Sequence, residues 1–281
     1  MIISAHALTR CSALLLVLGI GVVSAGTGCA AQADDDEAAD EDIGTQSQAF
    51  SGIYGADWGV YSPSWLNIDG AATATHSCFL TGIFGNLDSH NDPVRVGMRT
   101  GSPNWLLDVR PDSGNPLRGQ AACVKSIANR TPEVNFYSGQ GAQKLGDGGP
   151  AFPARRCFLT NIRSRVPYGA EPNDFASSND RLRVFQNSIT KDWYIGGTGN
   201  ASGTARCIDV TEDLGGVNYY GPGTYDVMEH VAGRRCFLTE VGGAFTANDF
   251  NNGVSVYVDN DSLRWKLKVS AGKFAAVQCA R

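Results

Sequence analysis

Short stretches in which apolar and polar residues alternate recur along the chain from residue 51 onward. In 254–258 the valines occupy every second position, and 265–269 alternates in the same way. Successive side chains of a β-strand point to opposite faces, so these stretches predict strands with one buried face. No long segment has the three-to-four-residue spacing of a helix, and the pattern therefore indicates an all-β protein.

The motif Cys-Phe-Leu-Thr occurs three times, starting at Cys78, Cys157 and Cys236, with the same spacing of 79 residues each time. Each copy is followed by an Asn/Asp-rich loop, an alternating strand and a tryptophan; an aromatic stretch precedes each copy. The three tryptophans are Trp105, Trp193 and Trp265. A fixed period of this kind indicates repeated units, each with about five short antiparallel strands.

We place the units at 51–129, 130–208 and 209–281. They could be tandem domains, or they could close around a pseudo-threefold axis, as in prism-like and trefoil-like folds. The links between the units contain strand-like sequence. This favours close packing of the three units.

Six of the eight cysteines lie in the three units, two in each. An even set of cysteines in an exported chain indicates disulfides, and the repeat selects one pairing, within each unit. The expected bridges are Cys78–Cys123, Cys157–Cys207 and Cys236–Cys279. No C-x-x-C pair occurs, which argues against a zinc or redox site. We expect no cofactor and assign no metal ligands.

Residues 1–29 have the pattern of a signal peptide, with an apolar run over 14–23 that is too short to span a bilayer core of about 30 Å. Small residues precede Cys29, and this resembles the lipobox of bacterial lipoproteins, which implies acylation of that cysteine. Gly26 stands where that family has a Leu-like residue, so cleavage by ordinary signal peptidase is the alternative. Either way the protein is exported, to the cell envelope by a lipid anchor or as a secreted protein.

Residues 30–50 hold seven acidic side chains within 34–42. Like charges repel one another, so we expect a disordered tether between the anchor and the folded units. From Phe50 onward acidic and basic residues nearly balance. A nearly neutral folded part offers no electrostatic footprint for nucleic acid, so we expect no nucleic-acid partner.

The Asn/Asp-rich loops are the candidate binding loops, because amides and carboxylates can hydrogen-bond sugar hydroxyls or coordinate calcium. The same residue types also simply build turns. The loop candidates are Asp88, Asn91, Asp92, Asn173, Asp174, Asn179, Asp180, Asn248, Asp249, Asn251 and Asn252. The alternation makes the three repeated tryptophans core residues, and it turns Tyr194 and Tyr257 outward as candidate surface aromatics.

No G-x-S-x-G, H-E-x-x-H, P-loop or dinucleotide-binding motif is present, and we expect no enzyme activity. A triplicated unit suits several similar binding sites better than one asymmetric catalytic site. The leading prediction is a surface-displayed binding module, similar to a lectin or adhesin, that binds a glycan. The alternatives are a structural envelope lipoprotein with a protein partner, and a secreted hydrolase with a non-standard site.

The region 51–281 resembles CFLT-containing repeats in secreted proteins of myxobacteria and their relatives. The resemblance rests on the four-residue motif and on the spacing of tryptophan and cysteine in each unit. It implies export and a repeated β fold, and it carries no catalytic residue to this chain.

Overall fold

Antiparallel strands make up most of the described chain, as the alternation predicts. The computed structural model describes residues 55–61, 64–88, 92–99, 101–111, 114–125, 128–162, 174–211 and 218–281. The predicted signal peptide, Cys29 and the acidic tether lie outside these ranges. Among the described residues, no helix is long and apolar enough to cross a membrane.

In the residues that the structure describes, each unit contains six strands. The first has β1 (Gly55–Val60), β2 (Ser64–Ala72), β3 (Ser77–Gly85), β4 (Val94–Met98), β5 (Asn104–Val109) and β6 (Leu117–Val124). The second has β7 (Val134–Phe136), β8 (Gln143–Gly146), a 3-10 turn (Gly149–Ala151), β9 (Arg155–Ile162), β10 (Arg181–Gln186), β11 (Trp193–Thr198) and β12 (Gly203–Asp209). The third has β13 (Asn218–Tyr220), β14 (Gly223–Glu229), β15 (Arg235–Gly243), β16 (Gly253–Asp259), β17 (Arg264–Val269) and β18 (Lys273–Ala280). The count is one more than the sequence pattern indicated, because two strands precede each CFLT motif.

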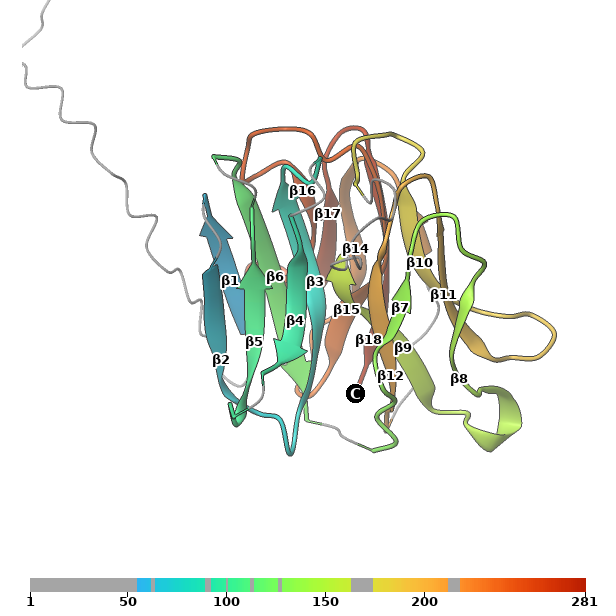
Figure 1. The fold of residues 1–281 in the computed structure, drawn as a ribbon. Helices are drawn as coiled ribbons and strands as arrows, with labels where there is room; N and C mark the ends of the chain where they lie inside the picture. Colours follow the sequence, from blue (N-terminus) through green and yellow to red (C-terminus); the bar gives the residue numbers. More distant parts are fainter. Residues whose placement is uncertain are drawn as a thin grey trace, which may run out of the picture. The chain divides into compact units, whose positions relative to one another are not determined.

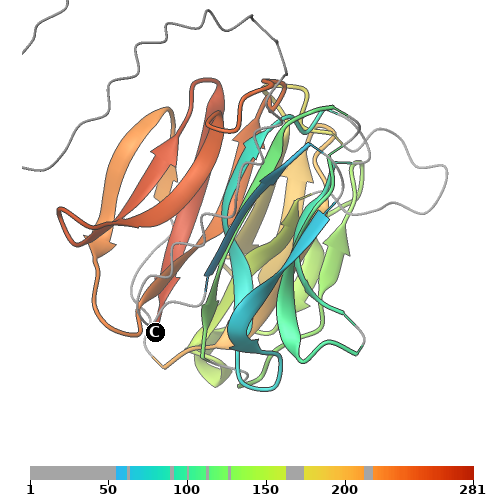
Figure 2. The ribbon, with the colours of Figure 1, turned by 90° about the vertical axis from the view of Figure 1, so that its left-hand side faces the viewer.

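The strands form three six-stranded sheets, and every sheet combines strands of two units. The strand orders are β1-β6-β3-β16-β17-β14, β13-β18-β15-β10-β11-β8 and β2-β5-β4-β9-β12-β7. The first, third and sixth strands of a unit enter one sheet, and its second, fourth and fifth enter another. Strands from distant parts of the sequence therefore lie side by side (Figures 1 and 2). The units are thus interlocked in a cyclic, pseudo-threefold manner rather than strung in tandem.

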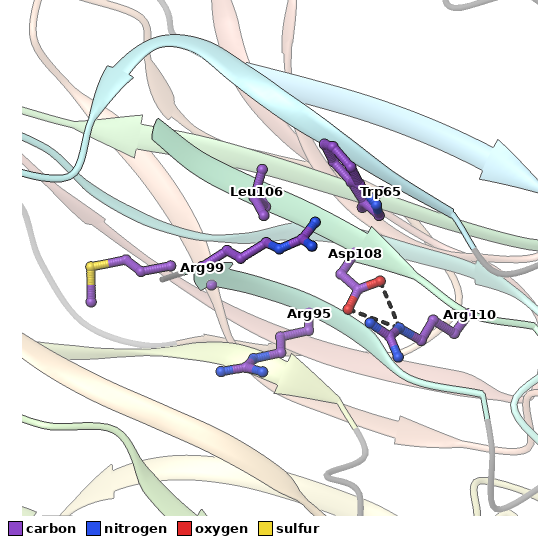
Figure 3. Close-up of a pocket in the computed structure, with 8 residues that line it drawn as sticks. Trp65, Arg95, Arg99, Leu106, Asp108 and Arg110 are labelled. Carbon is purple, nitrogen blue, oxygen red and sulfur yellow. Dashed lines mark hydrogen bonds and ion pairs between the residues drawn. The ribbon is translucent and has the colours of Figure 1, made fainter. Parts of the chain in front are cut away.

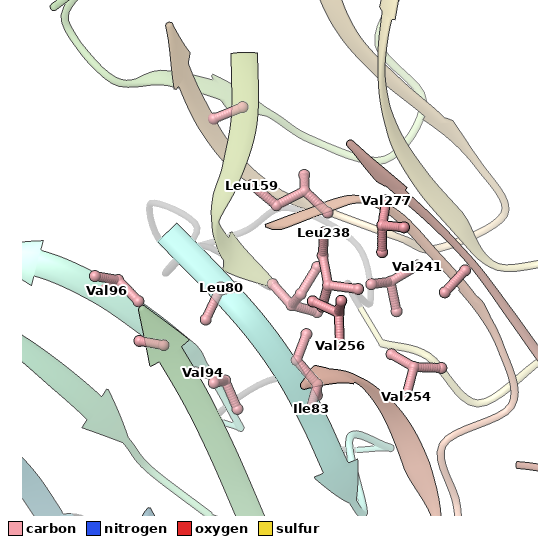
Figure 4. Close-up of a cluster of buried hydrophobic side chains, with 14 of the residues drawn as sticks. Leu80, Ile83, Val94, Val96, Leu159, Leu238, Val241, Val254, Val256 and Val277 are labelled. Carbon is pink, nitrogen blue, oxygen red and sulfur yellow. The ribbon is translucent and has the colours of Figure 1, made fainter. Parts of the chain in front are cut away.

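The strand that carries CFLT joins each pair of units. It pairs with the fourth strand of another unit, as β3 with β16, β9 with β4, and β15 with β10. At these junctions apolar residues stand opposite one another, for example Ile83 opposite Val254. Their side chains are buried in one core shared by the three units (Figure 4).

The phenylalanine of each motif lies where the three units meet. The rings of Phe79, Phe158 and Phe237 are fully buried, and their centroids are 4.9–5.1 Å apart in edge or tilted contacts. Aromatic pairs favour this spacing and these orientations. One residue of the motif thus makes the central contact among all three units.

The loops that follow the CFLT strands meet in a ring of backbone hydrogen bonds. The amide of Leu87 donates to the carbonyl of Phe245 at 2.7 Å, and that of Phe245 donates to Phe175 at 2.6 Å. The amide of Phe175 closes the ring by donating to Leu87 at 3.0 Å. All three side chains are fully buried, so the three loops are tied together beneath their surface.

The disulfides join Cys78 to Cys123, Cys157 to Cys207 and Cys236 to Cys279, which confirms the predicted pairing within units. In each case the two cysteines stand directly opposite each other on neighbouring strands. Three buried bridges of this kind indicate an oxidising, extracytoplasmic environment.

Candidate functional site

The Asn/Asp-rich loops gather around the ring of Leu87, Phe175 and Phe245. The Asn86 amide, one residue before that ring, donates to the side-chain oxygen of Asn248 at 3.1 Å and links two loops. Two of the predicted loop residues, Asn91 and Asn173, lie outside the described residues. Exposed members are Asp88, Asn179, Asn248, Asp249 and Asn251.

Several of the candidate loop residues form hydrogen bonds within the protein that stabilise the loops. Asp180 is buried, and its carboxylate accepts backbone hydrogen bonds from Ser177 at 2.6 Å and Asn200 at 2.8 Å. The other inward contacts are Asp174 with Asn200, Asp249 with the amide of Asn251, and Asn252 with Lys273; Asp92 is fully buried. These are turn interactions of the usual kind. In the described part of the chain, no cluster of three His, Cys, Asp or Glu could hold a metal ion.

The aromatic residues follow the predicted faces of the strands. Trp105, Trp193 and Trp265 are buried in the core. Tyr194 and Tyr257 point the other way and are half-buried. The ring of Tyr194 stacks on Phe185, with centroids 5.9 Å apart.

A hollow that contains none of the predicted site residues lies on the outward face of β2, β5 and β4 in the first unit (Figure 3). Its volume is about 510 Å³, within the usual range for small-molecule pockets. We call it the Trp65 groove. Its lining residues are Trp65, Arg95, Gly97, Met98, Arg99, Leu106, Asp108 and Arg110.

Strand register assembles the Trp65 groove. Trp65 stands opposite Asp108, and Asp108 stands opposite Arg95, so the three form one row across β2, β5 and β4. In β2 the neighbouring Leu66 and Ile68 pack inward on the core. Alternation therefore turns Trp65 outward, where 48% of its surface stays exposed.

Three arginines and one aspartate give the groove an excess of positive charge. The Nε of Arg110 donates to both carboxylate oxygens of Asp108, at 2.9 and 3.0 Å. This hydrogen bond raises the pKa of Arg110 above its ordinary value. The guanidinium of Arg99 lies 5.4 Å from the centroid of the Trp65 ring and forms no ion pair with any described residue. Arg95 reaches Glu133, beside the groove, at 3.3 Å.

A glycine distinguishes this part of the groove from the equivalent places in the other two units. Gly97 in β4 stands opposite Leu106, the residue after the core tryptophan Trp105. The equivalent places in the second and third units are occupied by Phe185 and Tyr257. The nearest atoms to a Cβ built at Gly97 belong to the end of the Arg95 side chain, the closest at 3.0 Å. The Arg95 guanidinium therefore lies over Gly97, at the place where the other two units carry an aromatic ring.

Sequence signals for the groove existed at two positions. Trp65 precedes Leu66 and alternates with apolar neighbours, which predicts an outward ring. Gly97 breaks the pattern of an aromatic at its place in the repeat. The remaining lining residues come from three strands, and their proximity depends on a register that no local pattern reveals.

A scan against protein-family models finds no family that matches this chain, and a search of curated proteins finds no match either. The chemistry of the Trp65 groove is therefore the basis on which a function can be proposed.

Proposed function

We propose that the protein is an exported, lectin-like carbohydrate-binding protein and that the Trp65 groove is its sugar site. The observation that carries this proposal is a half-exposed indole ring beside guanidinium and carboxylate groups in one hollow. A sugar ring has an apolar C–H face that packs on an aromatic plane. Its hydroxyl groups take hydrogen bonds from such side chains at the edge.

The exposure of the groove's apolar side chains supports a binding role. Trp65 is 48% exposed and Met98, also in the lining, is 42% exposed. The core tryptophans of the same fold are almost completely buried. Leaving large apolar groups together in water is unfavourable, and such surfaces commonly mark binding sites.

The proposed location is the outer side of the cell envelope. The disulfides fit an oxidising compartment, and the predicted signal peptide directs export. In this proposal Cys29 carries the lipid, and the acidic stretch 30–50 holds the binding module away from the membrane surface. Cys29→Ser should move the protein from the membrane fraction to the soluble fraction, and unchanged fractionation would contradict the anchor.

A glycan array probed with the full-length protein tests the sugar site. Trp65→Ala should abolish binding or weaken it by at least about tenfold, the loss expected when an aromatic anchor is removed. Ile189→Ala is the matched control, because Ile189 is 87% exposed on the β10–β11 turn, outside the groove lining. Binding that survives Trp65→Ala would exclude the groove, and an array without signal for the native protein would reject the function.

A further inference from the structure

We propose that the Trp65 groove selects acidic saccharides, in which the sugar ring carries a carboxylate or a sulfate group. This inference rests on the proposed carbohydrate-binding function and names its ligand class. The supporting observation is the balance of charge around the indole ring: three arginines line the groove, and its single aspartate is already hydrogen-bonded by Arg110.

Arg99 is the residue best placed to bind the acid group. Its guanidinium contacts the Trp65 ring and has no carboxylate partner among the described residues. A cation at an exposed aromatic face is held weakly, whereas a charge-assisted hydrogen bond to an acid group is strong. A sugar that stacks on Trp65 would displace the guanidinium of Arg99 from the ring. Its acid group could then form an ion pair with Arg99.

Arg95 adds a second incompletely neutralised charge. Its partner Glu133 also pairs with the buried Arg206, and both nitrogen–oxygen distances are 3.3 Å. One carboxylate thus serves two guanidinium groups. Burial lowers the pKa of Arg206, and the nearby charges of Arg130 and Arg95 lower it further, against the opposing effect of Glu133. This side of the groove is therefore short of negative charge, which an acidic ligand would supply.

The other ligand charges fit less well. A neutral sugar would cover Trp65 but leave the charge of Arg99 without an anion. A cationic sugar would be repelled by the same arginines. An acidic saccharide satisfies both features at once, since its ring covers the indole and its acid group meets the guanidinium.

Matched oligosaccharides separate the charge requirement from sugar binding itself. Calorimetric titration of the full-length protein would compare oligouronates from alginate and polygalacturonate with their carboxyl-reduced, neutral counterparts. A sulfated galactan and its desulfated form distinguish sulfate from carboxylate. We expect an acidic member to bind at least about tenfold more tightly than its neutral partner, as loss of a charge-assisted hydrogen bond requires. Raising salt from about 0.05 M to about 0.5 M should weaken only the acidic member.

Variants test the assigned residues. Arg99→Ala should weaken binding of the acidic saccharide about tenfold more than it weakens binding of the neutral partner, and Arg99→Lys should restore part of that difference. Gly97→Phe, which copies the second unit, should fill the groove and block both. Arg183→Ala is the matched control, because Arg183 occupies the place of Arg95 in the second unit and lies over Phe185 instead.

The outcomes separate the two proposals. Equal binding of acidic and neutral partners, or an unchanged affinity in Arg99→Ala, would overturn the acidic selectivity and leave the sugar site in place. An absence of binding to every saccharide, in titration and on the array, would overturn both. Thermal unfolding of each variant verifies that it is folded before its affinity is compared.

Discussion

Removing one ring from the axial cluster should destabilise all three units together. Phe158 is fully buried, and its ring centroid lies 4.9 Å from those of both Phe79 and Phe237. Each ring comes from a different unit. If the interlocked sheets form one cooperative structure, Phe158→Ala lowers the free energy of unfolding of the whole body and not of the second unit alone.

The magnitude follows from burial and from the ring contacts. Truncating a fully buried phenylalanine to alanine costs about 3–5 kcal/mol. Phe158 follows the disulfide-bonded Cys157 in β9, which limits how far the site can collapse; we expect about 4–5 kcal/mol, the upper part of that range. Each aromatic pair adds about 0.5–1.5 kcal/mol beyond its buried area. Phe237→Ala should therefore cost about 1 kcal/mol less when Phe158 is already alanine.

Unfolding in guanidinium chloride with the disulfides intact measures the destabilisation by Phe158→Ala and its coupling to Phe237→Ala. Far-ultraviolet circular dichroism and tryptophan fluorescence are the two probes. The two probes should report one coincident transition in every variant. Phe175→Ala is the control partner, because Phe175 lies in a different buried cluster, and its effect should add to that of Phe158→Ala within about 0.5 kcal/mol. Strict additivity of Phe158→Ala and Phe237→Ala, or a separate transition for one unit, would refute the reasoning.

Three further predictions concern stability. Replacing Cys157 and Cys207 with alanine removes a bridge across a separation of 50 residues and should cost about 4 kcal/mol in denaturant unfolding; a loss below about 1 kcal/mol would contradict the entropic argument. Asp180→Ala leaves two backbone amides without their buried acceptor and should cost about 2–3 kcal/mol, whereas Asp180→Asn should cost less, as thermal unfolding would show. The hydrogen bond from Lys266 lowers the pKa of Asp259 from 3.8 to about 2, so its contribution to stability is complete above pH 3.8 and disappears as the pH falls toward 2. Melting curves of Asp259→Asn and the native protein from about pH 2 to about pH 5 should therefore converge at the acid end, and a constant difference would exclude this linkage.

The sequence predicted where the strands lie better than it predicted which strands pair with one another in the sheets. Period-two alternation located the strands because a buried face imposes it directly. The period of 79 residues paired the cysteines because equivalent residues in repeated units occupy equivalent places. The exchange of strands between units was not predictable in this way. It depends on which strand edge meets which, and β3 pairs with β16 across most of the chain.

The candidate site was harder to predict for a related reason. Alternation reports which face a side chain takes, so Tyr194 and Tyr257 were assigned outward. It does not report neighbours on that face. Trp65, Arg95 and Asp108 are brought together by the register of three strands. The Asn/Asp-rich loops were predicted as binding loops because they recur. In the structure, however, Asp180 accepts a hydrogen bond from the Ser177 amide, and Asn252 accepts one from Lys273.

In this fold the residues that recur in every unit are buried, whereas the proposed site is formed by residues on the solvent-facing side of β2, β5 and β4. Residues that repeat in all three units, such as the cysteines, the CFLT phenylalanines and the core tryptophans, are buried, and packing restricts what each place can hold. Outward positions are under no such restriction and can differ between units without disturbing the core. The place held by Gly97, Phe185 and Tyr257 shows this, since one unit has a glycine where two carry aromatic rings. In a protein built this way, a binding site is to be sought where the outward face departs from the repeat, and the Trp65 groove is such a departure.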